Sequence, residues 1–304
     1  MRFRPPRFLT VLSLLLPLSL PLWLPLCLLL ADGCAPKDSR EAPKLLIVAS
    51  IAPLGSLASE IAGAHADVLI VVPPGMNPHV FDLTPELLRR TSDADVLLLN
   101  GAGLEFWAAK LRENIRNSAL MEITATDGMT LLGGHDHGNP HFWLDPILAM
   151  EAARRIRDAL VRKDSSHEAT YRANAQRLLD SLGLLHADIL REVATWRKRT
   201  FIATHATWDY FAARYDLQQL ATLESIPGRE ISPREMADII RVMRTTSTTA
   251  IFAETLSSLK AVEMLATETG ARYAVLDPLG SPQTATRYID LMRYNLRHMS
   301  GIMR

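Results

Sequence analysis

The chain has 304 residues, 48% of them hydrophobic, so it is long enough to bury a sizeable core. At about 100–200 residues per domain, this length predicts two domains. Basic and acidic residues number 33 each, and the resulting net charge of zero offers no electrostatic basis for binding nucleic acid or an anionic surface. Both cysteines, Cys27 and Cys34, lie near the amino terminus, which excludes a disulfide framework or a cysteine-based zinc site in the rest of the chain.

The amino terminus has the pattern of a secretory signal. Three arginines precede an uncharged run over residues 8–31, and small residues follow it. The run is long enough for a membrane helix, but Pro17, Pro21 and Pro25 would each remove a helical hydrogen bond. We therefore predict that residues 1–33 are a cleaved signal peptide.

The segment around Cys34 resembles a bacterial lipobox, Ala31-Asp32-Gly33-Cys34, whose cysteine is lipidated and becomes the first residue of the mature protein. The alternative is an ordinary signal that is cleaved nearby, with Cys34 incidental. Residues 34–43 are small and polar, and we predict that they form a tether between the membrane and the fold.

The first half of the chain alternates apolar strand-like runs with helical patterns. The predicted strands are residues 44–51, 68–72 and 96–100, and the predicted helices are residues 55–64, 83–90 and 106–116. Such alternation indicates right-handed βαβ units and a parallel sheet. Ligands of such sheets gather beyond the carboxyl ends of the strands, which is where His79 falls.

The second half repeats this alternation after a long helical segment. Its predicted strands are residues 200–204, 250–254 and 273–276, and its predicted helices are residues 146–161, 167–197 and 232–244. The helix over 167–197 would be about 45 Å long, which is the length of a domain. We predict an N-terminal lobe over 44–166, a linking helix over 167–198 and a C-terminal lobe over 199–304.

Polar side chains with metal-binding chemistry follow several of these strands. A neutral imidazole nitrogen suits zinc and other late first-row metals. His79 follows the second strand, His141 lies in a loop rich in Gly and Pro, and His205 lies at the tip of the strand over 200–204. Glu254 ends a strand and Asp277 follows the last one, where an Asx-type turn before a proline is the structural alternative.

Four segments resemble the motifs of one protein family, in the same order along the chain. Residues 75–85 resemble G-x-D-P-H-x-Y-E-x-T-P, and residues 139–146 resemble D-P-H-x-W-L-D-P, with Asn139 where Asp is usual. Residues 205–215 resemble H-D-A-F-G-Y-F-A-x-R-Y, and residues 276–280 match L-D-P-L-G. The chain is thereby identified as a member of the metal-binding (zinc/manganese) solute-binding lipoprotein family of ABC importers.

This resemblance implies an α/β fold of two (β/α) lobes with parallel sheets, bridged by one long rigid helix, with a metal site in the cleft between the lobes. It implies His79, His141, His205 and Asp277 as the ligands. Glu254 would support them, or else be a structural residue with no role at the metal. Three imidazoles and a carboxylate form a closed set with no position for a reactive water, which favours carriage of an ion over catalysis.

The ion implied by three histidines is zinc. Manganese-selective relatives often carry Glu where His205 stands, so a manganese or iron receptor of the same family is the alternative. The neighbouring His135, Asp136 and His137 would form an auxiliary low-affinity metal loop, or else a plain surface loop.

The resemblance also implies partners and a location. They are an ABC permease subunit with its cytoplasmic ATPase, and a place in the periplasm or on the outer face of the cytoplasmic membrane, held by a lipid anchor. We expect a monomer that is not an enzyme. Two competing classes are a secreted zinc metallohydrolase, for which a His-Glu-x-x-His motif is missing, and an adhesin or scaffold with a structural metal.

Overall fold

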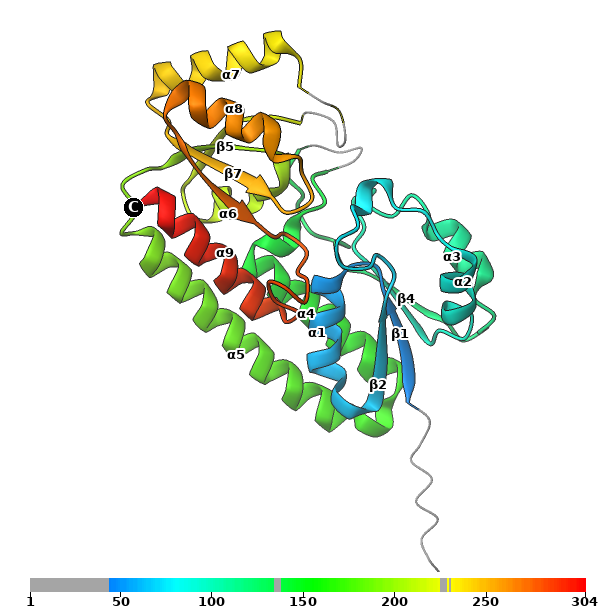
Figure 1. Cartoon of the computed structure of the whole chain (residues 1–304). Coiled ribbons are helices and arrows are strands. Elements are labelled where there is room, and N and C mark those ends of the chain that lie inside the picture. The colour runs from blue at the N-terminus through cyan, green and yellow to red at the C-terminus, as the bar shows by residue number, and fades with distance from the viewer. Residues whose placement is uncertain (1–43, 134–137, 225–228, 230) are drawn as a thin grey trace, which may run out of the picture. The chain divides into compact units, whose positions relative to one another are not determined.

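The computed structural model describes residues 44–133, 138–224, 229 and 231–304, and residues 44–304 form one compact unit (Figure 1). The predicted signal peptide, Cys34 and the tether lie outside the described residues. So do His135, Asp136 and His137 of the predicted auxiliary loop. Within the described part of the chain, no helix combines the length and the apolar character that a membrane crossing requires.

Two parallel four-stranded sheets organise the protein, one in each half of the chain. The first has the order β2-β1-β3-β4 and the second the order β6-β5-β7-β8. The strands are β1 (Leu45–Ala49), β2 (Ala66–Ile70), β3 (Val96–Leu99), β4 (Met121–Thr124), β5 (Thr200–Ala203), β6 (Gln218–Thr222), β7 (Ala250–Glu254) and β8 (Arg272–Leu276). Every residue of the central strands β3 and β7 is buried, as expected when helices cover both faces of a parallel sheet.

Helices connect the strands and cover the sheets. They are α1 (Ala52–Ala62), α2 (Pro85–Thr91), α3 (Ala108–Asn114), α4 (Pro146–Lys163), α5 (Glu168–Val193), α6 (Asp209–Arg214), α7 (Pro233–Thr246), α8 (Leu259–Thr269) and α9 (Tyr288–Met303). In the N-terminal lobe, α1 packs on β1 and β2, and α4 packs on β4. In the C-terminal lobe, α8 and α9 both pack on β7 and β8.

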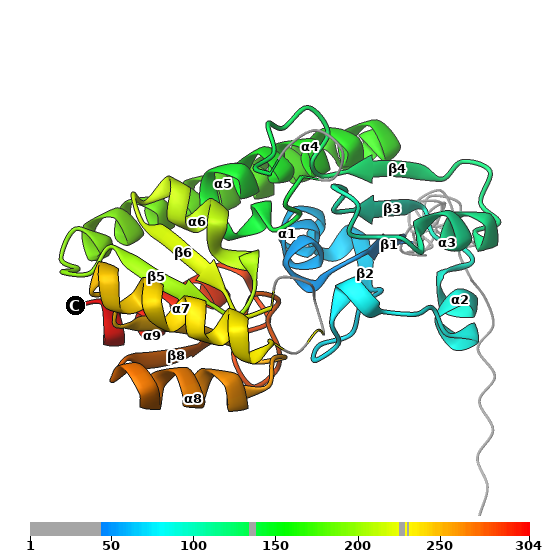
Figure 2. The same cartoon turned by 90° about the horizontal axis from the view of Figure 1, so that it is seen from above.

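Helix α5, with 26 residues, bridges the two lobes. It packs against α1 and α4 of the first lobe and against α9 of the second, and it runs alongside both lobes in the two views of Figures 1 and 2. Its buried residues recur at helical spacing along one face, as in Leu178, Leu182, Leu185 and Ile189. The hydrophobic cluster that contains them continues into both sheets, so the lobes share one core.

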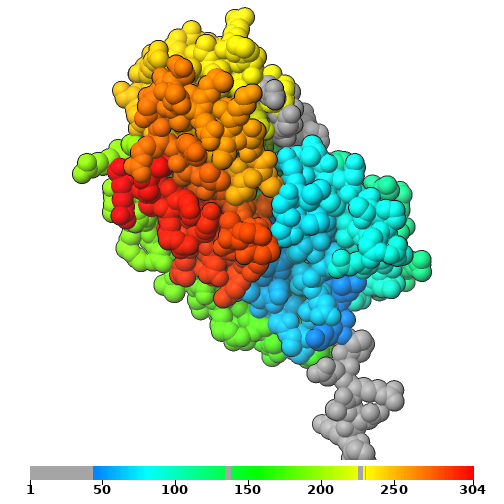
Figure 3. Space-filling model, in the orientation of Figure 1, coloured from blue at the N-terminus to red at the C-terminus, as the bar shows by residue number. Residues whose placement is uncertain are grey.

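The lobes also meet directly at their surfaces. On the face shown in Figure 3, the orange part of the C-terminal half abuts the blue to cyan part of the N-terminal half. Between the lobes, the backbone N–H of Tyr288 donates to Ser56 Oγ over 2.9 Å, and Arg287 lies 3.2 Å from Glu60. A second connection is the ion pair of Arg214 with the buried Asp145, at 2.7 Å.

Most predicted elements are confirmed, with ends shifted by a few residues. Thr84 caps α2, since Thr84 Oγ1 accepts from the backbone N–H of Leu87, and Ser232 and Glu235 form a capping box on α7. The sequence prediction omitted five strands and helices: the edge strands β4 and β6 and the helices α6, α8 and α9.

Candidate metal centre

The first histidine of the centre, His79, lies in a single 3-10 turn, Pro78–Val80, beyond β2. The chain reverses before it at Gly75, whose positive φ of 84° is a conformation that glycine adopts without strain. The side chain of Asn77 caps the turn, because its Oδ1 accepts from the backbone N–H of His79 over 2.9 Å. The turn therefore holds His79 at the carboxyl edge of the first sheet.

The second histidine, His141, is buried at the start of another 3-10 turn, Phe142–Leu144, which leads into α4. Asn139 Oδ1 accepts from both its backbone N–H, at 2.9 Å, and its ring Nδ1, at 2.7 Å. Asn100, at the end of β3, donates to the carbonyl of Pro140 over 3.0 Å. These bonds position the ring and leave Nε2 facing the cleft.

The third histidine, His205, comes from the other lobe. It lies two residues past β5 and precedes the turn Ala206–Trp208. Strand β5 is central in its sheet, between β6 and β7, so the residues that follow it enter the crevice at the carboxyl ends of the strands. His205 is half-buried and faces the N-terminal lobe.

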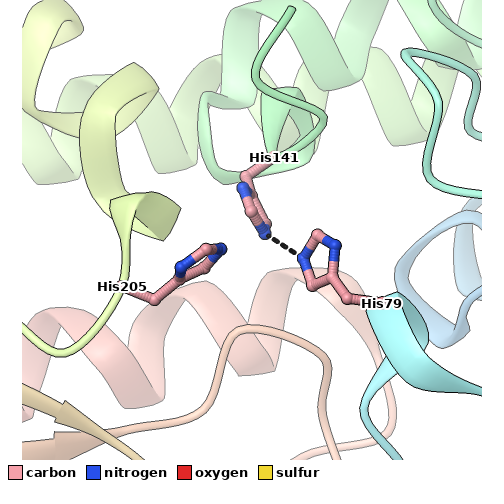
Figure 4. A group of neighbouring side chains, drawn as sticks. All are labelled: His79, His141 and His205. Atoms are coloured by element: carbon pink, nitrogen blue, oxygen red, sulfur yellow. Dashed lines mark hydrogen bonds between the residues drawn. The ribbon is translucent and has the colours of Figure 1, made fainter. Parts of the chain in front are cut away.

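The three imidazoles converge on one place between the lobes (Figure 4). Their ligand nitrogens all lie within 4.8 Å of one another, and the ring centroids are 5.3 Å apart in each pair. The Nε2 atoms of His79 and His141 lie 3.2 Å apart. Two nitrogens bound to one zinc at about 2.05 Å in a tetrahedral arrangement lie about 3.3 Å apart, so this spacing fits a shared ion.

Burial keeps these imidazoles uncharged. Desolvation, with a further contribution from His205, lowers the pKa of His79 to about 4. Desolvation and the two neighbouring histidines lower the pKa of His141 well below its ordinary value. Desolvation also lowers the pKa of His205, although Glu224 and Asp209 oppose it. Neutral imidazoles at neutral pH are the form that binds a metal.

Asp277, the carboxylate expected as a fourth ligand, follows β8 and is buried. Its Oδ1 accepts from the backbone N–H groups of Leu279, at 3.0 Å, and Gly280, at 2.8 Å, and its Oδ2 accepts from Thr284 Oγ1 at 2.5 Å. The structure brings the three histidines together within 4.8 Å but does not include Asp277 in that group. Its assignment as a ligand therefore stays a prediction.

Glu254, at the end of β7, lies in the wall of the same cavity as the histidines. It is buried, and its Oε1 makes no hydrogen bond within the described part of the chain. Burial raises the pKa of Glu254 to about 7, and the nearby carboxylates of Glu224 and Asp277 add to the rise. The three imidazoles thus face a region where the C-terminal lobe concentrates acidic groups.

A cavity of about 750 Å³ contains the site and is lined by both lobes. His79 and His141 come from the first lobe, and His205, Glu224 and Glu254 come from the second. This volume is far larger than one ion, so the cavity has room for an ion together with water. The sequence prediction missed Glu224, because no motif marks it and only the packing of β6 beside β5 brings it to the cavity.

The chain matches the family described as "Zinc-uptake complex component A periplasmic" over residues 47–301. It is 30% identical to the manganese-binding lipoprotein MntA of Halalkalibacterium halodurans, over 88% of this chain and 92% of that protein. It is 27% identical to the zinc-binding lipoprotein AdcA of Streptococcus pneumoniae, over 89% of this chain but only 58% of AdcA. A crystal structure of ZnuA superposes with a TM-score of 0.79 at 28% identity, covering 86% of this chain and 100% of that one.

Proposed function

The chain belongs to the zinc-uptake complex component A family, and from this premise we propose that it is the extracytoplasmic substrate-binding component of an ABC importer, with zinc as its substrate. The observation that carries the proposal is the convergence of His79, His141 and His205 from two lobes on one point. Because the ligands come from both sides of the cleft, binding of the ion would hold the lobes together.

The proposed fourth ligand is Asp277. Its hydrogen bonds to Leu279, Gly280 and Thr284 hold the carboxylate in one orientation. Oδ1 accepts two of these bonds, whereas Oδ2 accepts only the one from Thr284 and keeps a second lone pair for an ion. Glu254 is proposed to support the site from the cavity wall. A set of three imidazoles and one carboxylate leaves no open position for a catalytic water, which supports a carrier rather than a metallohydrolase.

The test is a zinc titration of the purified protein against a chromophoric chelator of known affinity. One tight site per chain is expected, and an absence of tight binding would reject the proposal. Removal of the zinc should leave the protein folded, because two hydrophobic clusters hold the lobes without a metal. Unfolding of the apo protein, followed by circular dichroism, would instead indicate a structural metal.

Manganese is the competing substrate, since the relative with 30% identity is named as a manganese-binding lipoprotein. Affinity alone does not separate the two ions, because most sites bind zinc more tightly than manganese. The deciding measurement is the metal content of protein purified from its native envelope. We further propose export to the periplasm or outer membrane face, a lipid anchor at Cys34, a monomeric state, and delivery to a permease with a cytoplasmic ATPase.

A further inference from the structure

Every polar group of Asn139 takes part in a hydrogen bond, and the bonds connect the two lobes. Its Oδ1 binds the backbone N–H and ring Nδ1 of His141. Its Nδ2 donates across the cleft to the carbonyl of Ala206, at 2.6 Å, and to Asp209 Oδ2, at 3.1 Å. Its own carbonyl accepts from Tyr210 Oη at 2.8 Å, and its backbone N–H donates to the carbonyl of Leu132 at 2.7 Å.

The acceptors in the C-terminal lobe determine which way the Asn139 amide faces. The carbonyl of Ala206 has no proton to donate, so the amide nitrogen must face it. The amide oxygen must then face His141. Because that oxygen only accepts, His141 Nδ1 must carry the proton, and the lone pair of the ring is placed on Nε2. Nε2 is the atom that lies 3.2 Å from His79 Nε2.

We infer that Asn139, held by Ala206 and Asp209, is a positioning residue for His141. It sets the metal-binding tautomer of His141 only while the two lobes are placed so that its amide contacts Ala206 and Asp209. The inference rests on the proposed function, because it concerns the affinity of the same site. Ala206 and Asp209 lie one and four residues after His205 in the chain. A shift of that segment therefore moves one ligand and at the same time releases the amide that orients another.

The residue types at this contact fit the inference. An asparagine both accepts and donates, whereas an aspartate at position 139 would direct a second carboxylate at Asp209, about 3 Å away. The two positions also depart together from the motifs that the chain otherwise resembles. Those motifs have an acid at the position of Asn139 and a glycine at the position of Asp209.

The experiment compares zinc affinity and zinc dissociation rate in Asn139→Ala, Asp209→Ala and the double variant. Asn139→Ala is expected to weaken zinc binding about 10–100-fold, the usual effect of losing a group that orients a ligand. Asp209→Ala should weaken it less, because Ala206 still accepts. In the Asn139→Ala background, Asp209→Ala should have a smaller effect than it has in the original protein. Additive effects, or an affinity of Asn139→Ala within twofold of the original protein, would overturn the inference.

Asn117 offers a matched control in the first lobe. Its Nδ2 also donates to a carbonyl, Ala94, and to a carboxylate, Asp95, while its Oδ1 accepts from the backbone N–H of Ala119. Asn117→Ala should lower the thermal midpoint as Asn139→Ala does but leave the zinc affinity unchanged. An equal loss of affinity in both variants would show that Asn139 acts through stability alone.

The tautomer itself can be read without a metal. ¹⁵N NMR of the histidine rings in the apo protein should show His141 protonated on Nδ1, and Asn139→Ala should shift this ring toward a tautomer mixture. Protonation on Nε2 in the unaltered protein would refute the inference. If the tautomer is as expected and zinc still does not bind, the proposed function fails while the role of Asn139 stands.

Discussion

His79 and His141 are separated by 62 positions in the chain, and their Nε2 atoms lie 3.2 Å apart. Two imidazoles at this distance either share a proton or share a cation, because two facing lone pairs repel each other. The tautomer of His141 places a lone pair in the contact. The position between the rings is therefore suited to a positively charged species, and His205 is the third imidazole beside it.

The first prediction concerns the ligands themselves. His79→Ala or His205→Ala should lower the zinc affinity by more than about 100-fold, which exceeds the usual effect of losing a supporting residue. The measurement is competition with a chromophoric chelator. His298 is exposed, and its Nδ1 hydrogen-bonds to the carbonyl of Tyr294 on its own helix, so His298→Ala is the control and should leave the zinc affinity unchanged. Unchanged affinity in either cleft variant would remove that histidine from the ligand set.

The second prediction separates the two carboxylates. Asp277→Asn should weaken zinc binding by more than about 100-fold, while Glu254→Gln should weaken it by about 10–100-fold at most, since a supporting residue contributes less than a ligand. Thr284→Ala removes the hydrogen-bond donor to Asp277 Oδ2, and its loss of zinc affinity should lie between those of the other two variants. The reverse order of the first two variants would make Glu254 the fourth ligand.

The third prediction is a pH dependence of the apo protein. The pKa of His79 falls from 6.5 to about 4 on folding, so between these values the unfolded chain binds more protons than the folded one. His141 and His205 shift in the same direction. The stability that the neutral imidazoles contribute is thus complete above pH 6.5 and is lost as the pH falls toward 4. The thermal midpoint of the apo protein should decrease over this window.

Glu254 has the opposite effect on the pH dependence of stability, and a variant at this position measures its contribution separately. Its pKa rises from 4.5 to about 7 on folding, so its contribution to stability is complete below pH 4.5 and is lost as the pH rises through 7. Glu254→Gln should therefore make the acid-induced decrease in thermal midpoint steeper. A midpoint that stays constant between pH 6.5 and 4 in this variant would contradict the assigned histidine shifts.

The fourth prediction concerns the ion pair between the lobes. Asp145 is buried, and Arg214 lies 2.7 Å from it with a side chain that is 36% exposed. Arg214→Met should destabilise the protein by about 2 kcal/mol, less than the 3–5 kcal/mol of a fully buried pair because water reaches the guanidinium. The exposed pair of Arg112 and Glu122 is the comparison, and Arg112→Met should change stability by less than about 1 kcal/mol. Denaturant unfolding measures both, and equal effects would contradict the prediction.

The parts of the fold that were predicted from sequence are those with strong local patterns. Buried central strands such as β3 and β7 are short apolar runs, and α2 and α7 carry capping residues at their first turns. The edge strands β4 and β6 have half-exposed residues and no apolar run, so only their pairing in the sheet defines them. Helix α8 does carry apolar residues at helical spacing, Leu259, Val262 and Leu265, and the sequence prediction overlooked them.

The residues of the candidate site also divide into those that a local sequence pattern predicts and those that it does not. His79, His141 and His205 were found because each lies within a motif, and their motifs occur in order. The contact of Asn139 with Asp209 joins residues 70 positions apart across the cleft, and no local sequence pattern predicts it. Such a bond depends on how two separately folded loops meet, which is information that only the packed structure contains.

The core shared through α5 has a consequence for how cargo leaves the protein. Ile47 of the first sheet, Leu182 of α5 and Phe252 of the second sheet belong to one buried cluster, and each large side chain exposed by a wide hinge motion would cost about 1.5–3 kcal/mol. Loaded and empty forms must therefore have nearly the same outline. A transporter that distinguishes the loaded from the empty protein has to contact the loops around the ion. Release of the ion then requires only a local exchange of the atoms that coordinate it.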